Sequence, residues 1–372
     1  MLTMFRLATD ETTLTPDGGA IRFPASTISL CRLATGRSAL FHLIHRLPRP
    51  HAATVLLPSY VAEGVIQPFL IAGFTILFYR LQSDLSPVID DVEALLGQVK
   101  GMAVVVLIHY FGFPAHSSEL SAVLTRYHAI VVDDCAHAPF TTTPTGESLA
   151  EHADLALYSL NKFIPVVDGA ILTSNRPDIN LSLSERELPE LPEDVQQAYQ
   201  NHLQAGRDLF NSDEPAQARC FLEKLGESYE QYYAVINSDL NPSRQSTRSR
   251  HVEDVFPYNG LVQHRLLNSR IVYDGLKSSV FSLVHPALPS GVVPWCIPAR
   301  VPAQRRTEIL DKLFEQGILL STLQDKWDFV PVEQRHHYAV EAAFLDEHVL
   351  IPISEFITSD SMLGMVERLN VI

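Results

Sequence analysis

Apolar runs of strand length alternate with helical segments between residues 54 and 173, and this alternation constrains the fold more than any other feature of the chain. The runs at 102–108 and 129–132 are typical of strands buried on both faces. Further strands are predicted at 54–57, 75–79, 155–158 and 170–173, and helices at 38–45, 62–72, 88–99 and 117–127. This order predicts an α/β fold, with a mostly parallel central sheet and helices on both faces. Sheets of this kind bind ligands at the carboxyl ends of their strands.

The second half of the chain has a different pattern. Residues 181–240 are acidic and favour helix, and the polar, basic stretch 241–250 is the best candidate for a linker. Beyond it the pattern predicts helices at 261–276, 303–316 and 360–369, and strands at 292–297 and 348–351. We therefore expect a large α/β domain at 1–243 and a smaller C-terminal α+β domain at 244–372.

Composition excludes several classes of protein. A hydrophobic content of 46% excludes disorder as the main state, and 28 Lys and Arg against 43 Asp and Glu argue against a nucleic-acid binder. The most apolar stretch, 54–79, contains Pro58, Glu63 and Gly73, so no membrane span is expected. No secretory signal is evident, and the four cysteines form no CxxC pair. We expect a cytoplasmic protein with neither nucleic-acid nor membrane partners.

A carboxylate and an imidazole follow the predicted strand at 129–132, in the order Asp133-Asp134-Cys135-Ala136-His137. A carboxylate at a strand end can hold a cationic ring nitrogen, and an imidazole three residues later can lie over a planar ring. Two acidic loop residues with a solvated histidine would also fit this pattern. A metal site is a further alternative, but no second ligand cluster has metal-like spacing, so we expect no metal.

A lysine, Lys162, follows the predicted strand at 155–158, just after Ser159. Lysine is rarely buried without a partner, and a desolvated lysine can attack a carbonyl carbon. A surface lysine after a strand is the ordinary alternative. One intervening segment separates Lys162 from Asp134, which is compatible with neighbouring strand ends.

The stretch Gly36-Arg37-Ser38-Ala39 begins a predicted helix, where free amide groups and the helix dipole can bind an anion. An ordinary capped helix would show the same pattern. The chain has neither the dinucleotide-binding nor the P-loop glycine motif. A site for a ring nitrogen, a lysine for an aldehyde carbon and a site for a phosphate together fit pyridoxal 5′-phosphate.

The residues between 36 and 175 resemble the DegT/DnrJ/EryC1/StrS aminotransferases, a family of fold-type I pyridoxal-phosphate enzymes. Ser38-Ala39-Leu40 resembles the family's phosphate-binding helix start, and VVDDCAHA resembles its VIEDAAQA motif. The stretches LLPSYVAEGVIQPFLIAGFTILFYRL, VVVLIHYFGFPAH and YSLNKFIPVVDGAILTSN resemble further family motifs. The family's GEGG sequence is altered here, to Val167-Asp168-Gly169-Ala170.

The resemblance implies a role for each matching residue. Asp134 matches the aspartate of the pyridine nitrogen, His137 the residue that flanks the ring, and Lys162 the Schiff-base lysine. Ser38, Ala39, Arg37 and Ser159 would hold the phosphate, and Tyr60 lies near the position of a ring-stacking aromatic. Relatives with histidine in place of the lysine are dehydratases, so Lys162 favours amino transfer. The family also implies a homodimer with active sites at the subunit interface, where the basic loop 244–250 would complete the partner's phosphate pocket.

The resemblance thus implies an aminotransferase that moves an amino group from an amino acid, by analogy glutamate, to a keto acceptor such as a keto sugar. A lyase, a decarboxylase or a carbon–carbon bond-forming enzyme on the same scaffold is the first alternative. A non-catalytic family member is the second, suggested by the altered GEGG motif. Trp295 and Trp327 are expected to pack within the small domain, and Cys135 to be a small core residue.

Overall fold

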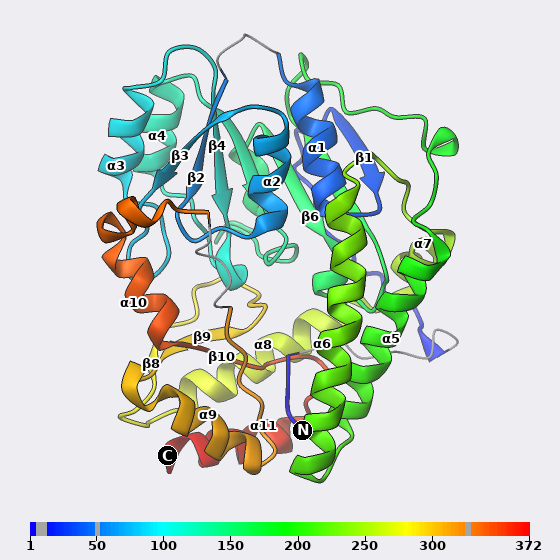
Figure 1. Cartoon of the computed structure of the whole chain (residues 1–372), viewed down its shortest axis with the longest axis vertical. Coiled ribbons are helices and arrows are strands. Elements are labelled where there is room, and N and C mark those ends of the chain that lie inside the picture. The colour runs from blue at the N-terminus through cyan, green and yellow to red at the C-terminus, as the bar shows by residue number, and fades with distance from the viewer. Residues whose placement is uncertain (5–12, 49–52, 324–328) are drawn as a thin grey trace.

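The larger sheet of the computed structural model has seven strands, in the order β1-β7-β6-β5-β4-β2-β3 (Figure 1). The structure describes residues 1–4, 13–48, 53–323 and 329–372. Neighbouring strands from β3 through β6 run parallel, whereas β7 is antiparallel to both β6 and β1. The strands are β1 (Ser29–Leu33), β2 (Thr54–Pro58), β3 (Thr75–Tyr79), β4 (Ala103–Ile108), β5 (Ile130–Asp134), β6 (Leu155–Ser159) and β7 (Ala170–Ser174). The predicted mostly parallel sheet is confirmed.

Four helices connect the strands of this sheet, and their packing follows from the strand order. They are α1 (Gly36–Arg46), α2 (Glu63–Ile71), α3 (Ile89–Leu96) and α4 (Ser118–Arg126). Helix α1 packs against α2, and α3 packs against α4. The connections β2–α2–β3 and β3–α3–β4 cross the sheet in opposite directions, so right-handed crossovers place α2 and α3 on opposite faces. This arrangement agrees with the predicted helices on both faces.

Two predictions about strand ends were wrong. Strand β5 does not end at residue 132 but includes Asp133 and Asp134, because both remain in register with Leu107 and Ile108 of β4. The stretch 292–297 is not a strand before Ile297, where β9 begins. Its residues bond to loops instead: the Trp295 amide donates to the Phe111 carbonyl at 2.7 Å. Sequence reasoning also missed β1, whose pairing with β7 is formed between distant parts of the chain.

The acidic segment forms a pair of long helices, α5 (Glu193–Phe210) and α6 (Pro215–Ser238), which pack along each other. In Figure 1 this pair runs beside both the larger sheet and the smaller unit below it. Helix α7 (Thr247–Val255) follows, capped by the Ser246 side chain, so the last residues of the predicted loop at 241–250 are helical. The remainder of that stretch links α6 to α7.

A second, three-stranded antiparallel sheet has the order β10-β9-β8, with its own hydrophobic core. Its strands are β8 (Ser282–Leu283), β9 (Ile297–Arg300) and β10 (His348–Ile351). The accompanying helices are α8 (Tyr258–Gly275), α9 (Arg306–Glu315), α10 (Ala339–Glu347) and α11 (Ser359–Asn370). These elements match the predicted C-terminal α+β unit, while the boundary at residue 243/244 stays a prediction. Among the described helices, none is both long and apolar enough to cross a membrane.

Candidate active site

The carboxyl ends of β4, β5 and β6 bring the predicted residues to one edge of the larger sheet. Ile108, Asp134 and Leu157 lie side by side across these three strands. Ser159, the last residue of β6, follows two positions after Leu157. A cavity of about 470 Å³ opens at this edge. Its lining includes the predicted residues Arg37, Tyr60, Asp134, His137, Ser159 and Lys162. A further cavity, of about 700 Å³, lies by α8 and the 286–293 loop and contains none of the predicted site residues.

Asp134 presents a buried carboxylate to the cavity. Its side chain accepts a hydrogen bond from the Ala136 amide at 2.9 Å, and 7% of the residue is exposed. Burial raises the pKa of Asp134, against the lowering effects of the Ala136 amide, His109 and Lys162. A cation placed in the cavity beside this carboxylate would offset its desolvation. Asp134 is therefore suited to hold a protonated ring nitrogen.

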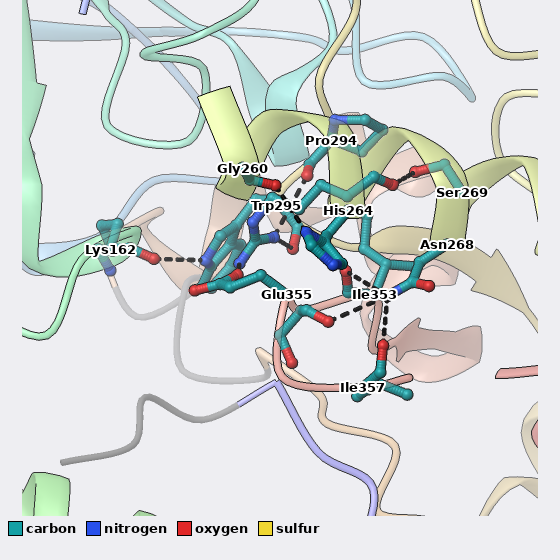
Figure 2. Close-up of polar contacts among 12 residues, drawn as sticks. Lys162, Gly260, His264, Asn268, Ser269, Pro294, Trp295, Ile353, Glu355 and Ile357 are labelled. Carbon is teal, nitrogen blue, oxygen red and sulfur yellow. Dashed lines mark hydrogen bonds and ion pairs between the residues drawn. The ribbon is translucent and has the colours of Figure 1, made fainter. Parts of the chain in front are cut away.

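Lys162 is held in place by Trp295 (Figure 2). The indole N–H of Trp295 donates a 3.0 Å hydrogen bond to the Lys162 carbonyl, and the Lys162 Nζ lies 5.5 Å from the centre of the indole ring. The expected role of Trp295 within the small domain was wrong, because this side chain reaches across to the end of β6. Trp327 lies outside the described residues. The stretch VVPWC that carries Trp295 contains no sequence signal for a site.

His137 lies against the same tryptophan. The imidazole and indole rings are stacked, with centroids 4.1 Å apart and an interplanar angle of 14°. The ring of Phe111 is nearly parallel to both at a greater distance. Trp295 thus covers one face of His137 and leaves the imidazole at the cavity wall. Phe111 itself has a φ of 57°, in the left-handed region that a bulky residue rarely adopts.

The start of α1 contributes amide groups to the cavity. Thr35, Gly36 and Arg37 line it, whereas Ser38 and Ala39 do not. The Ser38 amide and hydroxyl both bond to the Thr35 cap, so neither points to the cavity as a free donor. The amides of Gly36 and Arg37 precede the first intrahelical hydrogen bonds, and they are available for an anion.

Ser159 and Tyr60 both line the cavity, but their hydroxyls already have partners. The Ser159 hydroxyl donates to the Asn161 side chain at 2.9 Å. The Tyr60 hydroxyl donates to the Leu323 carbonyl at 3.1 Å, and its ring is tilted against that of Tyr110 at 5.4 Å. Cys135, between the two site residues of its motif, is buried, and burial raises its thiol pKa, as expected for a core residue.

Asp133 faces away from the cavity residues into a cluster with two histidines. Its carboxylate contacts the Nε2 of His116 at 2.8 Å and the Nε2 of His109 at 3.3 Å. The ligand atoms of these three side chains lie within 4.8 Å of one another, as a metal site would require. The His109 Nδ1, however, accepts the Ala115 amide at 3.0 Å, so in the neutral ring the proton is on Nε2. A protonated Nε2 faces the Asp133 carboxylate and is not a metal ligand, so the cluster is best described as a buried polar network around Asp133.

Helix α6 supplies a wall of the cavity that sequence reasoning missed. Tyr229, Tyr232, Tyr233 and Asn237 all line it. The tyrosines recur three to four residues apart on a helix with several charged residues. That spacing was a detectable signal for one buried face, although nothing in the sequence shows which surface the face contacts.

The residues around the cavity fit pyridoxal 5′-phosphate. A buried carboxylate, an amine and free helix amides are its complementary groups, and they come from three different elements that enclose one space. The aromatic surfaces of His137 and Trp295 add a wall suited to a planar ring.

Comparison with known proteins agrees with this site. Residues 36–202 match the DegT/DnrJ/EryC1/StrS aminotransferase family, and no curated protein matches the chain. Among solved structures, the aminotransferase TlmJ from Streptoalloteichus hindustanus has 14% identity and a TM-score of 0.68, covering 100% of this chain and 98% of its own.

Two further solved structures share the fold. The sugar aminotransferase CalS13 from Micromonospora echinospora has 17% identity and a TM-score of 0.63, with 100% of both chains covered. NtdA from Bacillus subtilis, with bound cofactor PMP, has 12% identity and a TM-score of 0.61, covering 93% of this chain and 74% of its own. Over residues 36–202, this chain is therefore similar to the DegT/DnrJ/EryC1/StrS aminotransferase family.

Proposed function

We propose that the chain transfers an amino group from an amino acid, with glutamate the expected donor, to a keto acceptor such as a keto sugar. The observation that carries this proposal is the convergence of Asp134, Lys162 and the α1 amides on one cavity. The acceptor class comes from the family resemblance; a neighbour that shares the fold, CalS13, is itself a sugar aminotransferase.

Pyridoxal 5′-phosphate, when bound, supplies an electrophilic carbon and a ring that withdraws electrons from the reacting centre. In our proposal Lys162 Nζ would lie at that carbon when the cofactor is bound, and its amine would accept and return the proton that moves during transfer. Asp134 holds the proton on the ring nitrogen through a charge-assisted hydrogen bond. His137, supported by Trp295, limits the tilt of the ring.

The positions of these residues suggest how water is excluded. Trp295 and Phe111 contribute apolar surface to the cavity, and the indole of Trp295 lies against the lysine amine. The Trp295 N–H holds the main chain of Lys162 in place, so only the lysine side chain is free to move. We also propose a homodimer, as the family resemblance implies, and a cytoplasmic location.

Borohydride reduction of the purified protein with pyridoxal 5′-phosphate tests the proposal. Reduction should fix the cofactor to the peptide containing Lys162. Lys162→Ala should abolish both this product and amino transfer, whereas Lys312→Ala, which removes a surface amine paired with Glu308, should leave both intact. Retained turnover in the Lys162→Ala variant would contradict the assigned role. Accumulation of the pyridoxamine form with donor alone would separate amino transfer from lyase or decarboxylase chemistry.

A further inference from the structure

Leu323 lines the active-site cavity, and both polar groups of its main chain are bound by buried side chains. The Tyr60 hydroxyl donates to the Leu323 carbonyl at 3.1 Å, and the Leu323 amide donates to His348 Nε2 at 2.8 Å. The Leu323 side chain is partly buried and packs against the main hydrophobic core. A residue outside helices and strands ordinarily leaves its amide and carbonyl to water. Leu323 therefore cannot withdraw from the cavity without breaking two hydrogen bonds.

His348 is held in the neutral form that this contact requires. Its ring is fully buried, and its Nδ1 lies 2.8 Å from the Phe344 carbonyl, which can only accept, so Nδ1 carries the proton and Nε2 accepts. Burial lowers the pKa of His348 to about 4. The Leu350 amide also donates to the Ser321 carbonyl at 2.9 Å, which attaches the preceding residues to β10. The acceptor for the Leu323 amide is thus present throughout the neutral pH range.

Tyr60 is held in its turn by one face of α10. Its ring is 2% exposed, lies edge-on to Phe344 at 5.5 Å and is tilted against Tyr110 at 5.4 Å. The neighbouring Ser59 hydroxyl donates to the buried Glu341 carboxylate at 2.7 Å. Glu341 and Phe344 are three residues apart on α10 and therefore share a face of the helix. This face fixes the orientation in which the Tyr60 hydroxyl meets its acceptor.

A run of aromatic side chains connects Tyr60 to the lysine. The Tyr110 hydroxyl donates to the Tyr60 carbonyl, and its ring centre is 6.2 Å from that of Phe111. The rings of Phe111 and Trp295 are parallel within 2° at 6.5 Å, and Trp295 supports Lys162. Every one of these residues lines the cavity. They form an apolar wall that extends from the Tyr60 contact to the lysine.

We propose that Leu323 is a specificity-determining residue whose side chain limits the length of the substrate beside Lys162, and that Tyr60 is its positioning residue. The inference rests on the proposed function, in which donor and acceptor occupy the same space in turn. A leucine with a fixed main chain does not move aside for a longer substrate, so the wall itself discriminates by size. One methylene in such a pocket changes selectivity about 10- to 200-fold.

The first experiment tests the positioning of Leu323 without any ligand. In the wild-type protein the Leu323 amide should be protected from hydrogen exchange by its bond to His348. Tyr60→Phe removes only the hydroxyl and should speed this exchange about fivefold, as expected for the loss of one neutral hydrogen bond. Tyr338→Phe is the matched control and should leave the exchange unchanged. The Tyr338 hydroxyl also donates to a main-chain carbonyl at 3.1 Å, that of Phe78, and Tyr338 is buried.

The second experiment measures selectivity in the holoenzyme. L-Glutamate and L-2-aminoadipate, which is one methylene longer, are added separately, and accumulation of the pyridoxamine form is followed by absorbance. We expect the wild type to react faster with glutamate. Leu323→Ala should raise the ratio of the 2-aminoadipate rate to the glutamate rate about tenfold or more, and Tyr60→Phe should raise it by a smaller factor. Leu267→Ala, which removes a leucine that is 45% exposed on α8, should leave the ratio unchanged.

The outcomes separate this inference from the proposed function. If both donors react and Leu323→Ala leaves the ratio unchanged, or changes both rates equally, the role of Leu323 in specificity is overturned while amino transfer stands. Unchanged exchange in Tyr60→Phe overturns the positioning role of Tyr60. If the wild type reacts with neither amino acid, glutamate is overturned as the donor and the size limit with it, whereas the exchange experiment still decides the role of Tyr60.

Discussion

Replacement of Arg265 by methionine should destabilise the protein and loosen the support of the active-site lysine. Arg265, on α8, is 1% exposed and forms a 2.8 Å ion pair with Glu355. It also donates to the Trp295 carbonyl at 2.9 Å, so it fixes the residue that supports Lys162. Methionine keeps much of the aliphatic stem and removes the charge and the donors.

The expected magnitude follows from what the substitution leaves behind. Glu355 is 10% exposed, and its carboxylate would lose the ion pair with Arg265. Loss of one partner from a buried ion pair costs about 3–5 kcal/mol. Because Glu355 retains slight contact with water, we expect the lower end, about 3 kcal/mol in the free energy of unfolding. Removing both charges, in Arg265→Met with Glu355→Met, should cost less than the single change.

Urea denaturation followed by circular dichroism measures these differences, provided that intrinsic fluorescence gives the same transition. A cost below about 1 kcal/mol for Arg265→Met would refute the reasoning, because it would fall within the range of an exposed pair. A double variant no more stable than the single one would also refute it. The contribution of Arg265 would then come from packing on Phe163, which lies 4.9 Å from its guanidinium carbon.

Two further predictions concern the network behind the site and the loop that carries Phe111. Burial raises the pKa of Asp133, but the imidazoles of His116 and His109 lower it by more, so the net shift is downward. Burial lowers the pKa of His116, but the Asp133 carboxylate raises it by more, so the net shift is upward. The stabilisation by the pair should be full between about pH 4 and 6.5, and should fall at lower pH as Asp133 is protonated and at higher pH as His116 loses its proton. The destabilisation caused by His116→Asn, from urea midpoints, should therefore be larger at pH 5.5 than at pH 9, and an equal effect would mean that the charge of His116 does not change between these pH values. Gly112 has a φ of 103°, and a Cβ there would lie 2.7 Å from the Val293 carbonyl oxygen. Gly112→Ala should lower the free energy of unfolding by about 1–3 kcal/mol. Gly73→Ala is the control and should cost less, because Gly73 also has a positive φ, of 78°, but its Cβ would meet no atom. Equal costs, from urea denaturation, would show that the structure relaxes to relieve the close approach to Val293.

The parallel strands were predictable from the sequence because their signal is local. A strand buried on both faces must be apolar at nearly every position, as in β4. Crossover rules then bring the ends of β5 and β6 together, which is why the amino-acid order alone places Asp134 and Lys162 at one edge of the sheet. Arg37 and Ser159 follow from the same rules, since they begin or end elements next to those strands.

Trp295 and Tyr233 could not be placed in the same way. Each reaches the cavity from an element far along the chain, and its local sequence is compatible with ordinary core packing. The error at 292–297 has the same origin: an apolar run indicates burial but not whether its amides pair with a strand or with loops such as the one at Phe111. Strand β1 was missed because its pairing with β7 is also long-range.

The contacts of Trp295 explain how the site joins the two sheets. Asp134 and Lys162 lie at the edge of the larger sheet, whereas Trp295 accepts a hydrogen bond from Arg265 of α8, which is paired with Glu355. Arg265 and Glu355 belong to the C-terminal unit. If that unit moved relative to the larger sheet and took Trp295 with it, the bond of the Trp295 amide to Phe111 would break and the indole would leave both His137 and Lys162. The apolar wall of the cavity and the hydrogen bond to the Lys162 carbonyl would be lost together. Correct placement of the lysine consequently depends on the docking of the C-terminal unit as well as on the fold of the sheet that carries it.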